Sequence, residues 1–157
     1  MIQRIQSIFL LVAIICNGLL FSVSLFEWVS PSSPVSYSFN VWSSVKNDAG
    51  STSLMQQNIT LIAANFLLII MTIAVVFMYK NRKQQAKMCH LLVLLQLVMI
   101  CLVMFQWDVM KSVAGEAYNW QTGAGIVFLI LPAAAFLMAR YFILKDEALV
   151  RSADRLR

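Results

Sequence analysis

The sequence predicts an all-α membrane protein, a four-transmembrane-helix bundle with a small β-strand or hairpin cap in its first extracytoplasmic loop. Two observations predict this class. Hydrophobic residues make up 61% of the 157 residues and charged residues only 12%, whereas soluble domains are about 45–50% apolar and about 25% charged. A soluble fold of this length could not keep so much apolar surface from water. We therefore expect a single membrane domain over residues 1–157.

The second observation is that the apolar residues gather in four long runs. A helix needs about 20 apolar residues to cross the hydrocarbon core of a bilayer. Four runs meet this length, at about residues 5–26, 59–79, 88–107 and 124–144. The first run is longer than the apolar part of a signal peptide, which has about 7–15 residues. We therefore expect it to be a membrane span.

Basic residues are divided unequally between the two sides of this predicted bundle. Cytoplasmic loops are enriched in Lys and Arg. One side receives ten basic residues, and the other receives only Lys46 and Lys111; the ten are Arg4, Lys80, Arg82, Lys83, Lys87, Arg140, Lys145, Arg151, Arg155 and Arg157. The partition predicts that both ends of the chain lie in the cytoplasm.

Two segments are then predicted to lie outside the cytoplasm, residues 27–58 and 108–123. Residues 35–41 alternate between apolar and polar side chains, which is typical of a half-buried β-strand, and residues 47–50 form a turn signal. We expect one strand or a small hairpin over the mouth of the bundle. It is either a structural cap, which is the simpler interpretation, or a binding platform. Residues 108–123 are expected to be a loop.

Two further segments are predicted to lie in the cytoplasm. The short loop at residues 80–87 is expected to attract anionic lipid headgroups through Lys80, Arg82, Lys83 and Lys87. The tail at residues 145–157 lacks Gly and Pro, so it should extend the fourth helix or bend along the membrane surface. It is either a solvated helix end or a docking helix for a partner, with the candidate docking residues Glu147, Leu149, Arg151, Asp154, Arg155 and Leu156.

Four polar residues inside the spans are predicted to face the bundle interior, because polar side chains are costly in lipid. They are Asn17, Asn65, Thr72 and Gln96. The simpler hypothesis is hydrogen bonding between helices, with Asn17 and Gln96 as the expected pair because their depths match. The alternative is a polar path for a small solute or proton, although no acid or lysine lies at mid-membrane depth.

No catalytic, cofactor-binding or metal-binding residues are predicted. The single histidine, His90, has no second strong ligand at a matching depth, and the sequence holds no glycine-rich phosphate loop or Ser/His/Asp set. The basic residues form short clusters beside apolar runs, which argues against nucleic-acid binding. We therefore expect a protein that is not an enzyme and that binds the lipid bilayer and other membrane-protein subunits.

The two ends of the chain resemble those of a known protein family. Residues 1–6 (MIQRIQ) and 146–157 (DEALVRSADRLR) are similar to the ends of a family of small four-span bacterial inner-membrane proteins, seen mainly in Bacteroidetes-type bacteria and described as a domain of unknown function. The resemblance covers essentially the whole chain. It implies an inner-membrane location and no known activity, so no residue role follows from it.

The sequence as a whole predicts a non-enzymatic accessory or structural subunit of a larger inner-membrane complex. The absence of recognisable chemistry and the helical basic tail favour this hypothesis. The alternative is a small transporter or channel component, with a polar path formed by Asn17, Asn65, Thr72 and Gln96.

Overall fold

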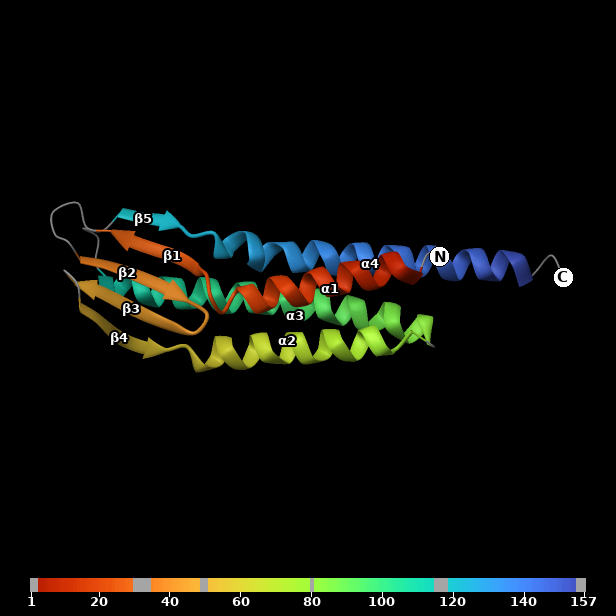
Figure 1. Cartoon of the computed structure of the whole chain (residues 1–157), viewed down its shortest axis with the longest axis horizontal. Helices are drawn as coiled ribbons and strands as arrows, with labels where there is room; N and C mark the ends of the chain where they lie inside the picture. Colours follow the sequence, from red (N-terminus) through yellow and green to blue (C-terminus); the bar gives the residue numbers. More distant parts are fainter. Residues whose placement is uncertain (1–2, 30–34, 49–50, 80, 115–118, 155–157) are drawn as a thin grey trace.

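The computed structural model is an elongated helical bundle with a small antiparallel sheet at one end (Figure 1). It describes residues 3–29, 35–48, 51–79, 81–114 and 119–154. The helices are α1 (Gln3–Leu19), α2 (Ile59–Phe77), α3 (Arg82–Ala114) and α4 (Gly125–Asp154). We call the end that carries the sheet the sheet end. The opposite end, where α2 turns into α3 and α4 continues toward the C-terminus, is the tail end.

Three of the helices are long and apolar enough to cross a membrane, over Ile59–Phe77, Arg82–Ser112 and Gly125–Val150. This supports the prediction of a membrane protein. The α3 helix has 33 residues, so at about 1.5 Å per residue it is about 50 Å long and exceeds the hydrocarbon core of about 30 Å. It therefore contains the predicted third span together with parts of both neighbouring loops. The α1 helix, with 17 residues, is shorter.

The predicted boundary of the first run, residues 5–26, is wrong. The α1 helix ends at Leu19, and strand β1 (Ser24–Val29) follows. Tight turn bonds close the helix, from the Ser22 N–H to the Leu19 carbonyl at 3.0 Å. Beyond the turn the chain pairs with a strand on each side, and this pairing outweighs the continuous apolar pattern.

The predicted strand at residues 35–41 is confirmed as β2 (Val35–Asn40), but the cap is larger than one strand or a hairpin. The other strands are β3 (Ser43–Asp48), β4 (Ser51–Gln57) and β5 (Asn119–Thr122). Together they form a five-stranded antiparallel sheet in the order β4-β3-β2-β1-β5. The prediction that residues 108–123 form a loop is wrong, because α3 continues to Ala114 and β5 pairs with β1.

Asn58 joins the sheet to the bundle at the start of α2. Its backbone N–H donates to the Trp42 carbonyl at 3.2 Å, and its side-chain Nδ2 donates to the Asn40 carbonyl at 2.8 Å. The first residues of α2 are thereby tied to the connection between β2 and β3. This contact positions the exposed side of the sheet relative to the helices.

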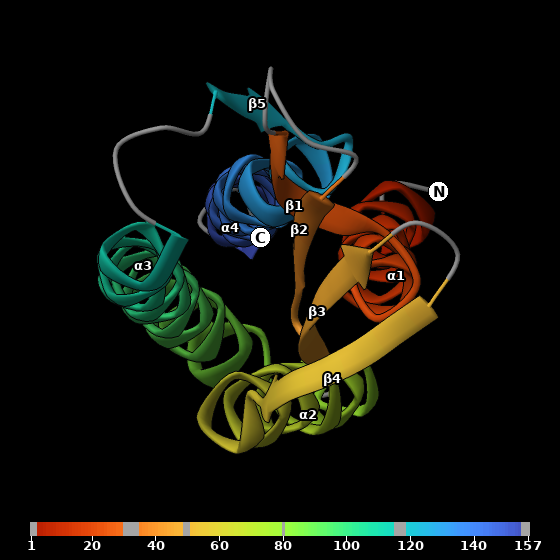
Figure 2. The ribbon, with the colours of Figure 1, turned by 90° about the vertical axis from the view of Figure 1, so that its left-hand side faces the viewer.

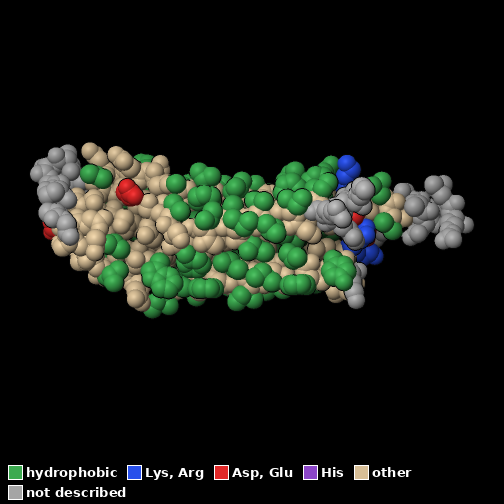
Figure 3. Space-filling model, in the orientation of Figure 1, with side chains coloured by type: hydrophobic (Ala, Val, Ile, Leu, Met, Phe, Trp, Pro, Cys, Tyr) green, Lys and Arg blue, Asp and Glu red, His purple; other side chains and the backbone are tan. Residues whose placement is uncertain are grey.

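The helices form a ring in which each contacts two neighbours: α1 packs on α2 and α4, and α3 packs on α2 and α4 (Figure 2). Fully buried apolar side chains fill the bundle, among them Leu10, Leu61, Leu92 and Phe136. Exposed apolar side chains lie on all four helices. On the face that Figure 3 shows they form a broad band, and basic side chains gather at the tail end of that band. This distribution is the one that a lipid environment favours.

Candidate functional site: the open edge of the sheet and its cleft

The middle strands and the edge strands of the sheet differ in burial. Around β1 and β2 the side chains belong to the core: Leu25, Trp28 and Phe39 are buried. The Phe26 ring stacks on Trp107 of α3 with centroids 5.2 Å apart, and Trp107 meets Trp120 of β5 edge-on at 5.6 Å. β1 and β2 therefore pack into the core at the end of the bundle.

At one edge of the sheet all seven residues of β4 are exposed, as are the four residues of β5 at the other edge. Leu54 is 70% exposed and Met55 is 41% exposed. β4 lies at one edge of the sheet, so one side of its backbone has no strand beside it in the described chain. Its sequence, STSLMQQ, contains neither charge nor proline, the residues by which proteins usually protect an edge strand. The other edge, β5, has only four residues.

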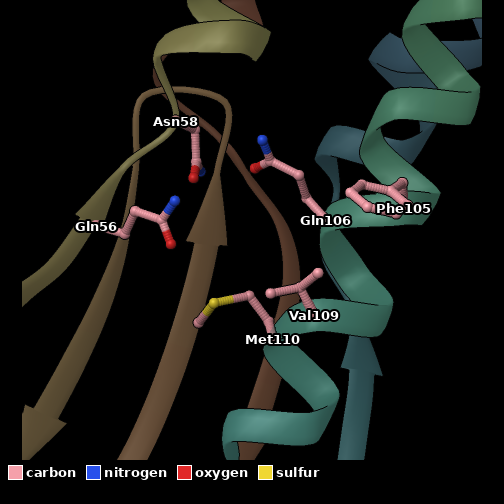
Figure 4. Close-up of a pocket in the computed structure, with 6 residues that line it drawn as sticks. All are labelled: Gln56, Asn58, Phe105, Gln106, Val109 and Met110. Atoms are coloured by element: carbon pink, nitrogen blue, oxygen red, sulfur yellow. The ribbon is translucent and has the colours of Figure 1, made fainter.

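A cleft of about 250 Å³ lies between the end of β4 and α3, lined by Gln56, Asn58, Phe105, Gln106, Val109 and Met110. The side chains of Gln56 and Gln106 extend into it from opposite walls (Figure 4). None of these residues titrates near neutral pH, so the lining offers amide hydrogen bonds and apolar contact. Such a lining suits an uncharged polypeptide segment.

The tail end holds a polar contact that joins three helices. Asp146 of α4 is 8% exposed and accepts hydrogen bonds from Arg82 of α3 at 3.1 Å and from Gln6 of α1 at 3.4 Å. A glutamine and an acid that lie 140 residues apart carry no local signal of contact.

The predicted pair of Asn17 and Gln96 does not form. Asn65 donates through Nδ2 to the backbone carbonyl of Asn17 at 2.9 Å, and Gln96 donates through Nε2 to the carbonyl of Leu129 at 2.8 Å. Leu129 directly follows Phe128, the residue whose carbonyl loses its donor within α4 because Pro132 has no N–H, so Gln96 bonds beside this interruption of the helix. The spacing of polar residues along the sequence cannot predict that a backbone carbonyl is the acceptor.

The four predicted polar residues are all buried, but their side chains differ in the hydrogen bonds that they make. Thr72 donates to the Leu68 carbonyl of its own helix at 2.6 Å. The Asn17 side-chain amide, the Asn65 Oδ1 and the Gln96 Oε1 have no hydrogen-bond partner among the residues that the structure describes. Asn17 also lies near the end of α1, not at its middle.

The comparison with protein families assigns the chain. A family described as Domain of unknown function (DUF4293) matches residues 2–156. The chain belongs to this family. No curated protein matches it. Family membership confirms the resemblance of the two ends, and DUF4293 brings no activity with it.

The predicted tail and loop residues of this DUF4293 chain are only partly described. α4 continues as a helix to Asp154, which confirms the helical extension of the fourth run. Glu147 is half-buried and Leu149 is exposed. Arg82 is partly buried, and Lys83 and Lys87 are exposed. The remaining predicted sites lie outside the described residues or side chains, namely Arg151, Asp154, Arg155, Leu156 and Lys80.

Proposed function

We propose that this chain is a non-enzymatic subunit of a bacterial inner-membrane assembly, and that it binds a partner protein through the open edge of β4. In this proposal four helices cross the membrane, the sheet lies outside the cytoplasm and the tail lies inside. The ten-to-two partition of basic residues supports this orientation, because the basic residues of the described chain at the tail end include Arg82, Lys83 and Lys87.

The single observation that carries the proposal is the complete exposure of β4 at the sheet edge. An extended segment of another chain can add to such an edge through main-chain hydrogen bonds, while pockets for side chains provide specificity. The cleft at the end of β4, with Gln56 and Gln106 on its walls, offers such a pocket. The absence of charge in β4 favours an uncharged partner strand.

The direction of the strands favours a different chain over a second copy of this one. The strands run roughly along the long axis of the molecule (Figure 1), which is the membrane normal in this proposal. A two-fold axis along that normal would bring two β4 strands together in parallel. Every pairing within the sheet is antiparallel, and an antiparallel β4 pair would place the two bundles in opposite orientations.

A photocrosslinking amino acid at Leu54 tests the proposal in native membranes. We expect one protein adduct there, whereas the same probe at Phe77, which is 73% exposed at the other end of α2, should not capture that protein. Thr52→Lys places a charge on the edge strand and should abolish the Leu54 adduct. The proposal is wrong if Leu54 captures only lipid, or if both positions capture the same protein equally.

A second candidate function is transport of a small polar solute, and the unpartnered amide atoms of Asn17, Asn65 and Gln96 favour it. Buried polar groups without partners are rare and are often satisfied by internal water. Replacing Asn17 by Leu should then abolish solute flux into proteoliposomes while the protein stays folded. If liposomes that contain the unmodified protein show the same solute flux as empty liposomes, this function is excluded.

A further inference from the structure

A groove of about 370 Å³ lies between α3 and α4 at the tail end, away from the sheet. Its lining comprises Lys83, Ala86, Lys87 and His90 from α3 with Arg140, Leu144 and Glu147 from α4. In each helix these residues recur every three or four positions, so they share one face. The groove is therefore a continuous feature of two antiparallel helix faces.

The polar lining is strongly biased toward positive charge. Lys83, Lys87 and Arg140 are cationic, and Glu147 is the acid among the lining residues. The Arg140 guanidinium Nη1 lies 3.3 Å from His90 Nδ1. Since an arginine N–H can only donate, Nδ1 of His90 is the acceptor in this contact. The groove thus offers an anion the ammonium groups of Lys83 and Lys87 and the guanidinium group of Arg140 as hydrogen-bond donors.

The neighbouring acid Asp146 does not neutralise this groove. Its Oδ2 accepts from Arg82 and Gln6, and it lies on another face of α4. The bond orients Arg82 toward α1 and α4, while the adjacent Lys83 belongs to the groove lining. Arg82 therefore takes part in the contact between helices, whereas Lys83 lines the groove.

We propose that this groove binds the phosphate of an anionic phospholipid, with an acyl chain along its apolar wall. Ala86 and Leu144 provide that wall, and the basic side chains of Lys83, Lys87 and Arg140 lie beside it. Arg and Lys at such a boundary are each attracted to anionic headgroups. The inference rests on the membrane placement proposed above, but it is independent of the role of β4.

The test uses the purified full chain in an uncharged detergent, with lipid binding followed by native mass spectrometry and by thermal unfolding. Phosphatidylglycerol is compared with phosphatidylcholine of the same acyl chains and with inorganic phosphate. We expect phosphatidylglycerol to bind on the order of tenfold more tightly than phosphatidylcholine. Equal binding of the two lipids overturns the proposal, and so does full stabilisation by inorganic phosphate, which would indicate a site for a free anion.

Variants locate the site. Lys87→Gln and Arg140→Gln should each weaken phosphatidylglycerol binding by about fivefold. Lys111→Gln removes the same charge at the opposite end of α3 and should have no effect. Lys87 is exposed, so its variant remains informative if Arg140→Gln does not fold. Unchanged binding in Lys87→Gln, or equal loss in Lys111→Gln, contradicts the assignment.

Discussion

Asp146 shows how one buried charge can hold the tail end of the bundle together. Its carboxylate accepts from two helices at once, whereas its own exposure is only 8%. A buried charge is stable only when it is paired and hydrogen-bonded. Arg82 and Gln6 fulfil that requirement, so this contact stabilises the packing of the three helices.

Replacing Asp146 by Asn should therefore destabilise the protein. The substitution removes the ion pair and leaves the Arg82 side chain, which is 31% exposed, without its charged acceptor. We expect a loss of about 1–3 kcal/mol in the free energy of unfolding, measured by chemical or thermal unfolding in detergent. Asp48→Asn is the matched control: its pair with Lys46 is exposed and 3.5 Å long, so its loss should have an effect below about 1 kcal/mol.

Asn17 and Gln96 should respond in opposite ways to substitution by Leu. Asn65 bonds to the backbone carbonyl of Asn17, so Asn17→Leu keeps that bond and removes two unpartnered amide atoms. Gln96→Leu removes the bond to Leu129. We expect Gln96→Leu to cost about 0.6–2 kcal/mol and Asn17→Leu to be neutral or stabilising, in the same unfolding assay. Strong destabilisation by Asn17→Leu would indicate that an internal water or ligand satisfies its amide.

At the scale of elements, a helix or strand could be predicted from the sequence when the pattern that defines it lies within its own segment. The three long helices and β2 could be predicted, because their patterns are strong and lie within one segment. β1 was missed because its apolar residues, in SLFEWV, continue the run of α1 without a polar break. β4 lacks alternation, and β5 has four residues that become a strand only by pairing with β1, about 90 residues earlier.

The β1–β5 pairing makes Gly123 a position where a side chain cannot be accommodated. A Cβ at Gly123 would collide with the backbone carbonyl of Ser24, and the Gly123 N–H donates to Leu25 at 2.9 Å. Gly123→Ala should therefore displace the start of α4 from β1 and destabilise the protein by more than about 1 kcal/mol. Gly18→Ala, where nothing lies within 4 Å, should instead be neutral or stabilise α1 by up to about 1 kcal/mol. Thermal unfolding of the two variants checks both signs.

At the scale of the whole molecule, the contacts of α1 bear on the number of crossings. Its 17 residues give a length of about 25 Å, at the lower limit for a span. Near its start, Gln6 bonds to Asp146 at the tail end, and near its end the Asn17 carbonyl accepts from Asn65 of α2. α1 therefore lies alongside α4 over much of the apolar band (Figure 1).

A helix that is held in this way is expected to cross with the other three, which places the N-terminus on the side of the α2–α3 turn. Single cysteines at Gln3, Ser53 and Gln84, in a chain whose three native cysteines are replaced by Ala, test this topology. In intact spheroplasts a membrane-impermeant thiol reagent should label Ser53→Cys alone, and lysis should expose Gln3→Cys and Gln84→Cys. Labelling of Gln3→Cys before lysis would mean that α1 does not cross, because its start would then share a side with the sheet.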